Sequence, residues 1–374
     1  MNEKKLGFGL MRLPLLDSNN AGSIDIEQLK QMVDLFISRG FTYFDTAWMY
    51  NAFQSEHAIK DALVSRYPRD SYTLATKLHH GFLKTKEDRD RIFNEQLNKT
   101  GVEFFDYYLL HDMGTDAYQK LTDLDCFNWI LDKKARGLVR HIGFSCHDTP
   151  EFLDKALTEH PEFEFVLLQI NYLDWDSAGI QSRKCYEVCV KHGKPVYVME
   201  PVKGGTLAHV PEAVEKMFKE CHPDWSIPSW AIRFCASQPG IRMVLSGMSS
   251  LAQMEDNSAF MQEFEPLSEQ ELALVRKAVD MINASIAIPC TGCAYCVDGC
   301  PMNIQIPKYF SLYNADKQDS DAKGWKSQGE YYDRLTHVFG KASDCVGCGQ
   351  CEEICPQHLP IADHLKEVAA HFGK

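Results

Sequence analysis

Two runs of the sequence concentrate cysteine. CTGCAYCVDGCP spans residues 290–301 and CVGCGQCEEICP spans residues 345–356, and both read C-x2-C-x2-C-x3-C-P. Thiolates at this spacing bind the irons of 4Fe–4S clusters, and the fourth cysteine of each run completes the cluster of the other run. Zinc is the alternative, but it needs four ligands in a compact tetrahedron and has no use for the third cysteine at this spacing. The two runs therefore predict two 4Fe–4S clusters.

The eight cysteines divide into two predicted ligand sets. The first set is Cys290, Cys293, Cys296 and Cys355, and the second set is Cys345, Cys348, Cys351 and Cys300. The doubled run is the signature of bacterial ferredoxins. Residues 301–344 are more than a compact ferredoxin requires and contain two predicted helices, so this part resembles dicluster ferredoxin modules with inserted helices. The hydrophilic stretch at 316–330 is predicted to be an exposed loop.

Four titratable residues elsewhere in the chain follow or end predicted strands. FDTAWMY places Asp45 at the end of one strand and Tyr50 in the loop after it. LATKLHH and YYLLHDM place Lys77 and His111 at the ends of the next two strands. Because adjacent parallel strands lie about 4.8 Å apart, we expect these four side chains to converge on one site. A carboxylate, an ammonium, a phenol and an imidazole together can transfer protons.

These residues are positioned by a unit that recurs along the chain: an amphipathic helix, a glycine that ends it and an apolar strand. Seven helices alternate with eight predicted strands. The strands are expected at residues 6–12, 41–45, 72–76, 105–110, 140–144, 165–170, 195–200 and 242–246. Strict alternation over roughly 250 residues predicts an α/β fold, a (β/α)8 TIM barrel, here followed by a small, mostly helical ferredoxin-like 4Fe–4S domain. A doubly wound open sheet is the alternative, which the absence of G-x-G-x-x-G after the first strand disfavours.

The motifs at the strand ends resemble the aldo-keto reductase family, and the whole chain resembles the group whose members carry a C-terminal dicluster 4Fe–4S domain. The resemblance covers about residues 5–260. It is carried by D-T-A-x-x-Y at 45–50, T-K at 76–77, L-L-H at 109–111, GFS at 143–145, Gln169 and SGMSSLAQMEDN at 246–257. Each motif alone is weak evidence, but their order and spacing together are specific.

The resemblance implies a division of labour among the four titratable residues. Tyr50 would protonate a substrate carbonyl oxygen while hydride arrives at the carbon. A phenol has an ordinary pKa near 10, so an adjacent ammonium, that of Lys77, would lower it. Asp45 would hold Lys77 in place, and His111 would orient the carbonyl.

The family resemblance also implies a nicotinamide cofactor, NADP(H). Ser145 and Gln169 would contact the nicotinamide carboxamide. The adenosine end would meet Gly247, Ser249, Gln253 and Asn257. This chain departs from the family at Met199, where a stacking aromatic is common, and at Cys146, where asparagine is usual. It also has Gly247 and Gln253 where many members place a cation for the 2′-phosphate, so NAD and a flavin stay open as alternative carriers.

Composition excludes several classes of partner and membrane protein. The formal charge of −13 argues against nucleic-acid and anionic-membrane partners. No apolar run reaches 18 residues, and the first twenty residues lack the apolar stretch of a signal peptide. Fourteen cysteines without such a signal indicate a reducing, cytoplasmic location. The six cysteines outside the runs are expected to be small buried side chains.

The sequence thus predicts a barrel at 1–267, a connecting helix at 268–288 and a dicluster domain at 289–374. We expect an oxidoreductase that reduces a small-molecule aldehyde or ketone with hydride from NADP(H), with the two clusters transferring electrons. One alternative is a reductase fed by ferredoxin electrons, directly or through a flavin, which would require a redox partner protein. The other alternative is a redox-sensing subunit without catalysis.

Overall fold

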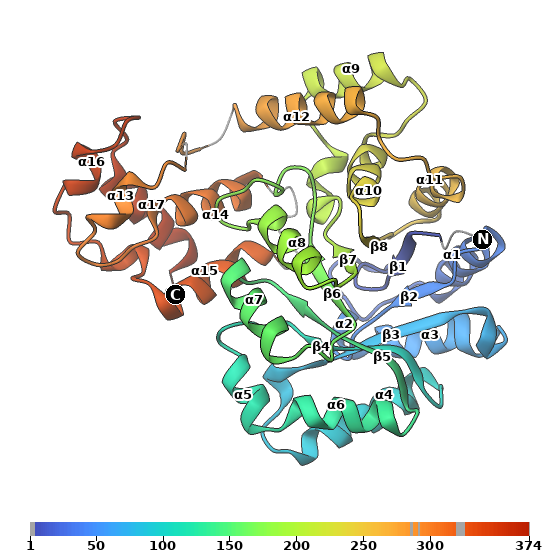
Figure 1. Cartoon of the computed structure of the whole chain (residues 1–374). Coiled ribbons are helices and arrows are strands. Elements are labelled where there is room, and N and C mark those ends of the chain that lie inside the picture. Colours follow the sequence, from blue (N-terminus) through green and yellow to red (C-terminus); the bar gives the residue numbers. More distant parts are fainter. Residues whose placement is uncertain (1–3, 285–286, 291, 319–325, 374) are drawn as a thin grey trace.

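The computed structural model describes residues 4–284, 287–290, 292–318 and 326–373. Eight parallel strands pair in sequence order, and β1 also pairs with β8, so the sheet closes into a barrel (Figure 1). The strands are β1 (Leu6–Gly9), β2 (Tyr43–Asp45), β3 (Thr73–His79), β4 (Phe105–His111), β5 (Val139–Cys146), β6 (Phe165–Gln169), β7 (Val196–Met199) and β8 (Ile241–Gly247). The predicted TIM barrel is confirmed, and the open-sheet alternative is wrong.

Helices surround the barrel (Figure 1). They are α1 (Ile26–Ser38), α2 (Tyr50–Phe53), α3 (Ser55–Ile59), α4 (Glu87–Thr100), α5 (Tyr118–Asp123), α6 (Cys126–Ala135), α7 (Pro150–Glu159), α8 (Ser182–Lys191), α9 (Glu212–Cys221), α10 (Ile227–Ser237) and α11 (Leu251–Gln262). Side-chain caps fix several helix starts: Asp25 accepts from the amide of Gln28, and Thr149 accepts from the amide of Phe152. Helix α12 (Glu269–Asn283) begins with a capping box at Ser268 and leads toward the C-terminal part.

The barrel interior is filled by aromatic and aliphatic side chains from alternate positions of the strands. This interior cluster consists of Tyr43, Ala75, Leu109, Phe165, Leu167, Tyr197, Met243 and Leu245. Gly143 on β5 makes room for it, because a Cβ there would lie 2.6 Å from the ring of Phe165. The opposite faces of the strands pack on the surrounding helices in a second, larger core. The rim of the barrel is therefore held by a rigid support.

The C-terminal part has a core of its own. Its helices are α13 (Tyr295–Asp298), α14 (Ile306–Gln318), α15 (Ser327–Val338), α16 (Gln350–Glu353) and α17 (Ile361–Phe372). They gather on one side of the barrel (Figure 1) around Tyr309, Phe310 and Leu365. The predicted loop at 316–330 is only partly testable, because residues 319–325 lie outside the described residues. Its two ends are helical, with Asp316–Gln318 in α14 and Ser327–Glu330 in α15.

Two helices of the C-terminal part contact the rim of the barrel. Helix α14 packs against the loop between β6 and α8, where Ser311 Oγ lies 3.0 Å from Ser177 Oγ and accepts from the amide of Gly179 at 3.2 Å. Ile180 from that loop belongs to the core of the C-terminal part. Helix α15 contacts the loops after β4 and β5. Among the described residues, no helix is long and apolar enough to cross a membrane.

Candidate active site and cysteine pockets

A buried ion pair joins Asp45, the last residue of β2, to Lys77 on β3. Lys77 Nζ is 2.5 Å from Asp45 Oδ1 and donates to the carbonyl oxygen of Thr46 at 2.7 Å. The Lys77 side chain is 0% exposed and that of Asp45 is 5% exposed. Burial alone would lower the pKa of Lys77, but Asp45 and Tyr50 together outweigh burial and raise it. Lys77 is therefore a fixed positive charge inside the rim.

Tyr50 lies beside this charge. It begins the short helix α2, in which Asn51 and Ala52 have left-handed backbone angles. The Lys77 ammonium is 4.8 Å from the centroid of the Tyr50 ring. Burial raises the pKa of Tyr50, and Lys77 acts in the opposite direction. Lys77 thus lowers the pKa of Tyr50, as predicted, but burial raises this pKa by more. Tyr50 is therefore a protonated phenol at neutral pH.

His111 ends β4 and completes the predicted group. Its ring centroid is 5.9 Å from that of Tyr50, and the two rings meet nearly edge to face at 81°. Burial, followed by the charge of Lys77, lowers the pKa of His111 well below its usual value, so its imidazole is neutral. Its Nδ1 is buried without a hydrogen-bond partner in the described part of the chain. The four predicted residues are therefore brought together.

The two residues predicted to meet the nicotinamide end lie on neighbouring strands. Ser145 is buried on β5, and its Oγ accepts from the amide of Asp112 at 2.8 Å. Gln169 ends β6 and donates from Nε2 to Asp174 Oδ2 at 2.9 Å. Its Oε1 is buried and, within the described residues, unpartnered. An amide oxygen in this state can accept from a carboxamide NH2 group.

The residues predicted to meet the adenosine end surround the start of α11. Ser249 N donates to Gln253 Oε1 at 2.7 Å, and Asn257 is buried with its Nδ2 on Ser246 Oγ at 3.1 Å. Gly247 ends β8 and lies against the side chain of Arg12. Sequence reasoning did not single out Arg12. It follows β1, far from this loop in sequence, so only the closure of β1 on β8 brings its side chain here.

A second buried ion pair was also not predicted. Lys203 Nζ is 2.5 Å from Asp174 Oδ1, and both side chains are 2% exposed. Asp174 accepts from Gln169 and from Asn171 through its other oxygen. This pair fixes the Gln169 amide in orientation. The stretch VKGG around Lys203 carries no motif that would have marked it.

The eight cysteines line two pockets in the C-terminal part. The first cysteine pocket, of about 330 Å³, is lined by Cys290, Cys293, Cys296 and Cys355. The second cysteine pocket, of about 360 Å³, is lined by Cys300, Cys345, Cys348 and Cys351. Each pocket thus takes three cysteines from one run and one from the other, as the spacing predicts. Ile306 at the start of α14 lines both pockets and separates them.

The thiols of these pockets are in apolar surroundings. Burial raises the pKa of Cys296 to about 12 and that of Cys351 to about 11. A thiolate is therefore unfavourable there unless a cation accompanies it. Four converging thiols in an apolar pocket fit an iron–sulfur cluster, which binds thiolates.

Arg334 of α15 joins the C-terminal part to the rim beside His111. Its guanidinium forms ion pairs with Asp112 at 2.7 Å, Glu330 at 3.0 Å and Asp116 at 3.2 Å. It also donates to the carbonyl oxygen of His147 at 2.6 Å. Its side chain is 2% exposed. Asp112 follows His111 directly, so this contact reaches the candidate active site.

Known proteins resemble both parts of the chain. A model of the Aldo/keto reductase family matches residues 5–280. The chain belongs to the aldo/keto reductase family. It is an oxidoreductase, and a model of the 4Fe-4S dicluster domain matches residues 289–359 of this aldo/keto reductase.

Three similar proteins illustrate the relationship of this aldo/keto reductase to others. An uncharacterized oxidoreductase of Schizosaccharomyces pombe is 23% identical over 266 residues, which cover 68% of this chain and 80% of the relative. The holo form of an aldo-keto reductase from Bacillus halodurans superposes with a TM-score of 0.59 at 23% identity, covering 73% of this chain and 91% of that chain. A Klebsiella pneumoniae aldo-keto reductase solved in complex with NADPH superposes with a TM-score of 0.58 at 20% identity, covering 74% of this chain and 95% of that chain. The two structures share the barrel fold with this chain.

Proposed function

We propose that the enzyme reduces a small aldehyde or ketone with NADP(H), with Tyr50 as proton donor. The observation that carries this proposal is the buried Lys77–Asp45 pair beneath the Tyr50 ring, with His111 beside it. A cation fixed beside a protonated phenol has one clear chemical use, which is to stabilise the phenolate that forms when the phenol gives up its proton.

The proton transfer follows from the charges of the site. Tyr50 is protonated at rest because burial raises the pKa of its hydroxyl. As negative charge develops on a substrate oxygen, the hydroxyl donates to it and the phenolate gains the Coulomb attraction of Lys77. Asp45 prevents Lys77 from losing its own proton. Neutral His111 donates a hydrogen bond that orients the carbonyl without competing as an acid.

NADP(H), when bound, supplies the hydride. Gln169 would accept from the carboxamide through the buried Oε1, and Ser145 would contact the same group. Gly247, Ser249, Gln253 and Asn257 would hold the adenosine end. Arg12, whose aliphatic side-chain atoms lie against Gly247, would supply positive charge for a phosphate, which the loop around α11 lacks. NADP(H) specificity would therefore depend on a residue outside that loop.

Two 4Fe–4S clusters would occupy the two cysteine pockets. Cys290, Cys293, Cys296 and Cys355 would bind one, and Cys300, Cys345, Cys348 and Cys351 the other. Such clusters exchange single electrons. The accessory electron-transfer role is proposed because α14, which carries Ile306 between the pockets, also packs on the loop that follows β6 and Gln169.

The test combines substitution with cofactor analysis. Tyr50→Phe should lower kcat/KM for carbonyl reduction by about 10²–10⁴, because a general acid is removed. NADPH affinity, measured by fluorescence titration, should be unchanged. Tyr118→Phe, which removes a hydroxyl bound to Glu159 at the surface, is the matched control and should keep full activity. Equal rates for the Tyr50 variant and the wild type would contradict the proposal.

A second candidate is a reductase fed by ferredoxin electrons, directly or through a flavin. The contact of the cluster-bearing half with the β6 loop favours it, because electrons from the pockets would arrive next to the cofactor site. Extraction of the anaerobically purified enzyme separates the two candidates. About eight irons with nicotinamide-dependent turnover supports the first, whereas a bound flavin reduced by a ferredoxin partner supports the second.

A further inference from the structure

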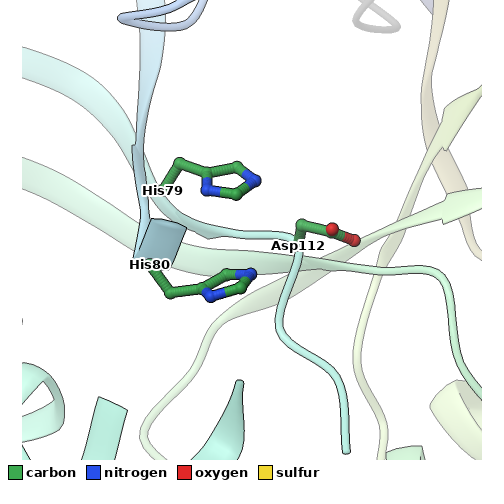
Figure 2. A group of neighbouring side chains, drawn as sticks. All are labelled: His79, His80 and Asp112. Atoms are coloured by element: carbon green, nitrogen blue, oxygen red, sulfur yellow. The ribbon is translucent and has the colours of Figure 1, made fainter. Parts of the chain in front are cut away.

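Three side chains of metal-ligand type lie together outside the group that the mechanism uses. His79 ends β3, His80 begins the 3-10 turn that follows (His80–Phe82), and Asp112 comes directly after β4. One ligand atom from each residue lies within 4.8 Å of those of the other two. In Figure 2 the two imidazoles lie one above the other, with the carboxylate opposite them. The two rings are stacked, with their centroids 4.6 Å apart.

Asp112 supplies a buried donor atom that is available for a further ligand. Asp112 is 7% exposed, and its Oδ1 is buried with no hydrogen-bond partner in the described ranges. A buried carboxylate oxygen without a partner is costly unless a cation or a donor binds it. A neutral imidazole keeps one nitrogen lone pair, and this is the form in which histidine binds metal ions.

The surrounding charge favours a cation. Arg334 is the nearby guanidinium that pairs with Asp112, but Asp116 and Glu330 pair with it as well. Burial raises the pKa of Glu330 to about 7, so Glu330 is only partly ionised at neutral pH, but Asp112 and Asp116 alone already outnumber the one guanidinium. The negative charge left over lies beside His79 and His80, both of which interact with Asp116. One existing contact must give way: the amide of Gly81 donates to His79 Nδ1 at 2.9 Å. Whichever nitrogen of His79 binds an ion, this amide must turn to the solvent, which is adjacent because Gly81 is exposed.

We propose that His79, His80 and Asp112 form a binding site for one divalent transition-metal ion, of which Zn²⁺ is the reference case. Two imidazoles and one carboxylate are ligands that this class of ion prefers, and three protein ligands leave a coordination position open. The ring centroids of His79 and His111 are 5.1 Å apart, so the open coordination position lies near the proton-transfer residues. A ligand oxygen of a bound small molecule can complete the shell there.

The test uses the cluster-loaded, full-length chain under anaerobic conditions. Equilibrium dialysis against Zn²⁺ should load one zinc per chain, with iron and sulfide unchanged. His80→Ala should weaken zinc binding by at least about tenfold, since even the loss of an outer-shell partner costs that much. His79→Ala provides a second, independent variant. His209→Ala, at an exposed histidine, is the matched control and should bind zinc like the wild type.

X-ray absorption at the zinc edge distinguishes this site from the cysteine pockets. Nitrogen and oxygen ligands at about 2.0–2.1 Å, with imidazole scattering that is weaker in His80→Ala, would support the proposal. Sulfur ligands at about 2.3 Å would place the zinc in the cysteine pockets and overturn it. Equal zinc affinity in His80→Ala and the wild type would overturn it as well.

Discussion

Replacing Arg334 by methionine removes a charge on which the contact between the two halves of the molecule depends. The methionine side chain keeps most of the length and apolar contact of the arginine stem. The guanidinium forms ion pairs with Asp112, Asp116 and Glu330 at 2.7–3.2 Å and is 2% exposed. The variant therefore leaves Asp112, 7% exposed, without its counter-charge.

The expected loss of stability follows from burial of the ion pair. Removing one partner of a buried pair costs about 3–5 kcal/mol, because the other charge stays buried without compensation. Asp116 and Glu330 can turn toward water, since their side chains are 22% and 27% exposed, so they add little. We expect a loss of about 3 kcal/mol. It should appear as earlier release of the C-terminal part and as lower kcat/KM, because Asp112 adjoins His111.

Urea unfolding of the cluster-loaded protein, followed by tryptophan fluorescence and by visible absorption, measures this loss. Arg136→Met is the matched control. Arg136 pairs with Asp132 at 3.4 Å with both side chains more than half exposed, so its removal should cost less than about 0.5 kcal/mol. Arg334→Lys should recover only part of the loss, because an ammonium cannot match the guanidinium fork. A cost for Arg334→Met as small as that of Arg136→Met would refute the reasoning.

The same substitution should change the pH dependence of stability. Burial alone would raise the pKa of Asp112, but the charges around it, chiefly Arg334, lower it below 3.8. A carboxyl with a depressed folded-state pKa stabilises the protein above its unfolded pKa, near 4, and this contribution is lost as pH falls. Without Arg334 the burial effect remains and the pKa rises. The stability difference between wild type and Arg334→Met should therefore be larger at pH 8 than at pH 5.

Four further outcomes are expected. Burial holds the pKa of Tyr50 above 10, so the rate of carbonyl reduction should be flat between pH 6 and 9; a fall in this range with an apparent pKa near 7 would count against Tyr50 as the donor. Lys77→Met should cost about 3–5 kcal/mol in urea unfolding, and the double variant with Asp45→Leu should cost less than Lys77→Met alone, because no buried charge is left over. Cys355→Ala should reduce the iron count of the anaerobically purified protein; an unchanged count would exclude this residue as a ligand. Gly143→Ala should destabilise by about 1–3 kcal/mol in the same assay, because its Cβ would lie 2.6 Å from a ring of β6.

Much of the fold could be predicted from the sequence because barrel strands are buried on both faces. Each strand is then a short apolar run, and the glycine that ends several of the helices marks where the next strand begins. The strand ends were less predictable: β2 is Tyr43–Asp45 rather than 41–45, since pairing with neighbouring strands decides where a strand begins. Helix α9 (Glu212–Cys221) was not predicted, because it lies outside the repeated unit.

The candidate site was predictable where its residues lie on strands or belong to the D-T-A-x-x-Y motif, and unpredictable where other loops or the C-terminal part carry them. Lys77 and His111 are fixed by the register of β3 and β4, so their convergence follows from barrel geometry. Arg334 could not be identified in this way, because its partner Asp112 lies more than two hundred residues earlier and meets it only when the two halves pack together. His79 and His80 were visible in LATKLHH, but their proximity to Asp112 depends on loop conformation.

The interleaving of the two cysteine runs has a consequence for biosynthesis. Each pocket takes its fourth thiol from the other run, so the ribosome must have translated Cys355 before the first pocket can be closed. Chains fold from the N-terminal domain onward while they are made, so the barrel can form first. Its acidic rim at Asp112 and Asp116 then stays open to water until α15 arrives with Arg334.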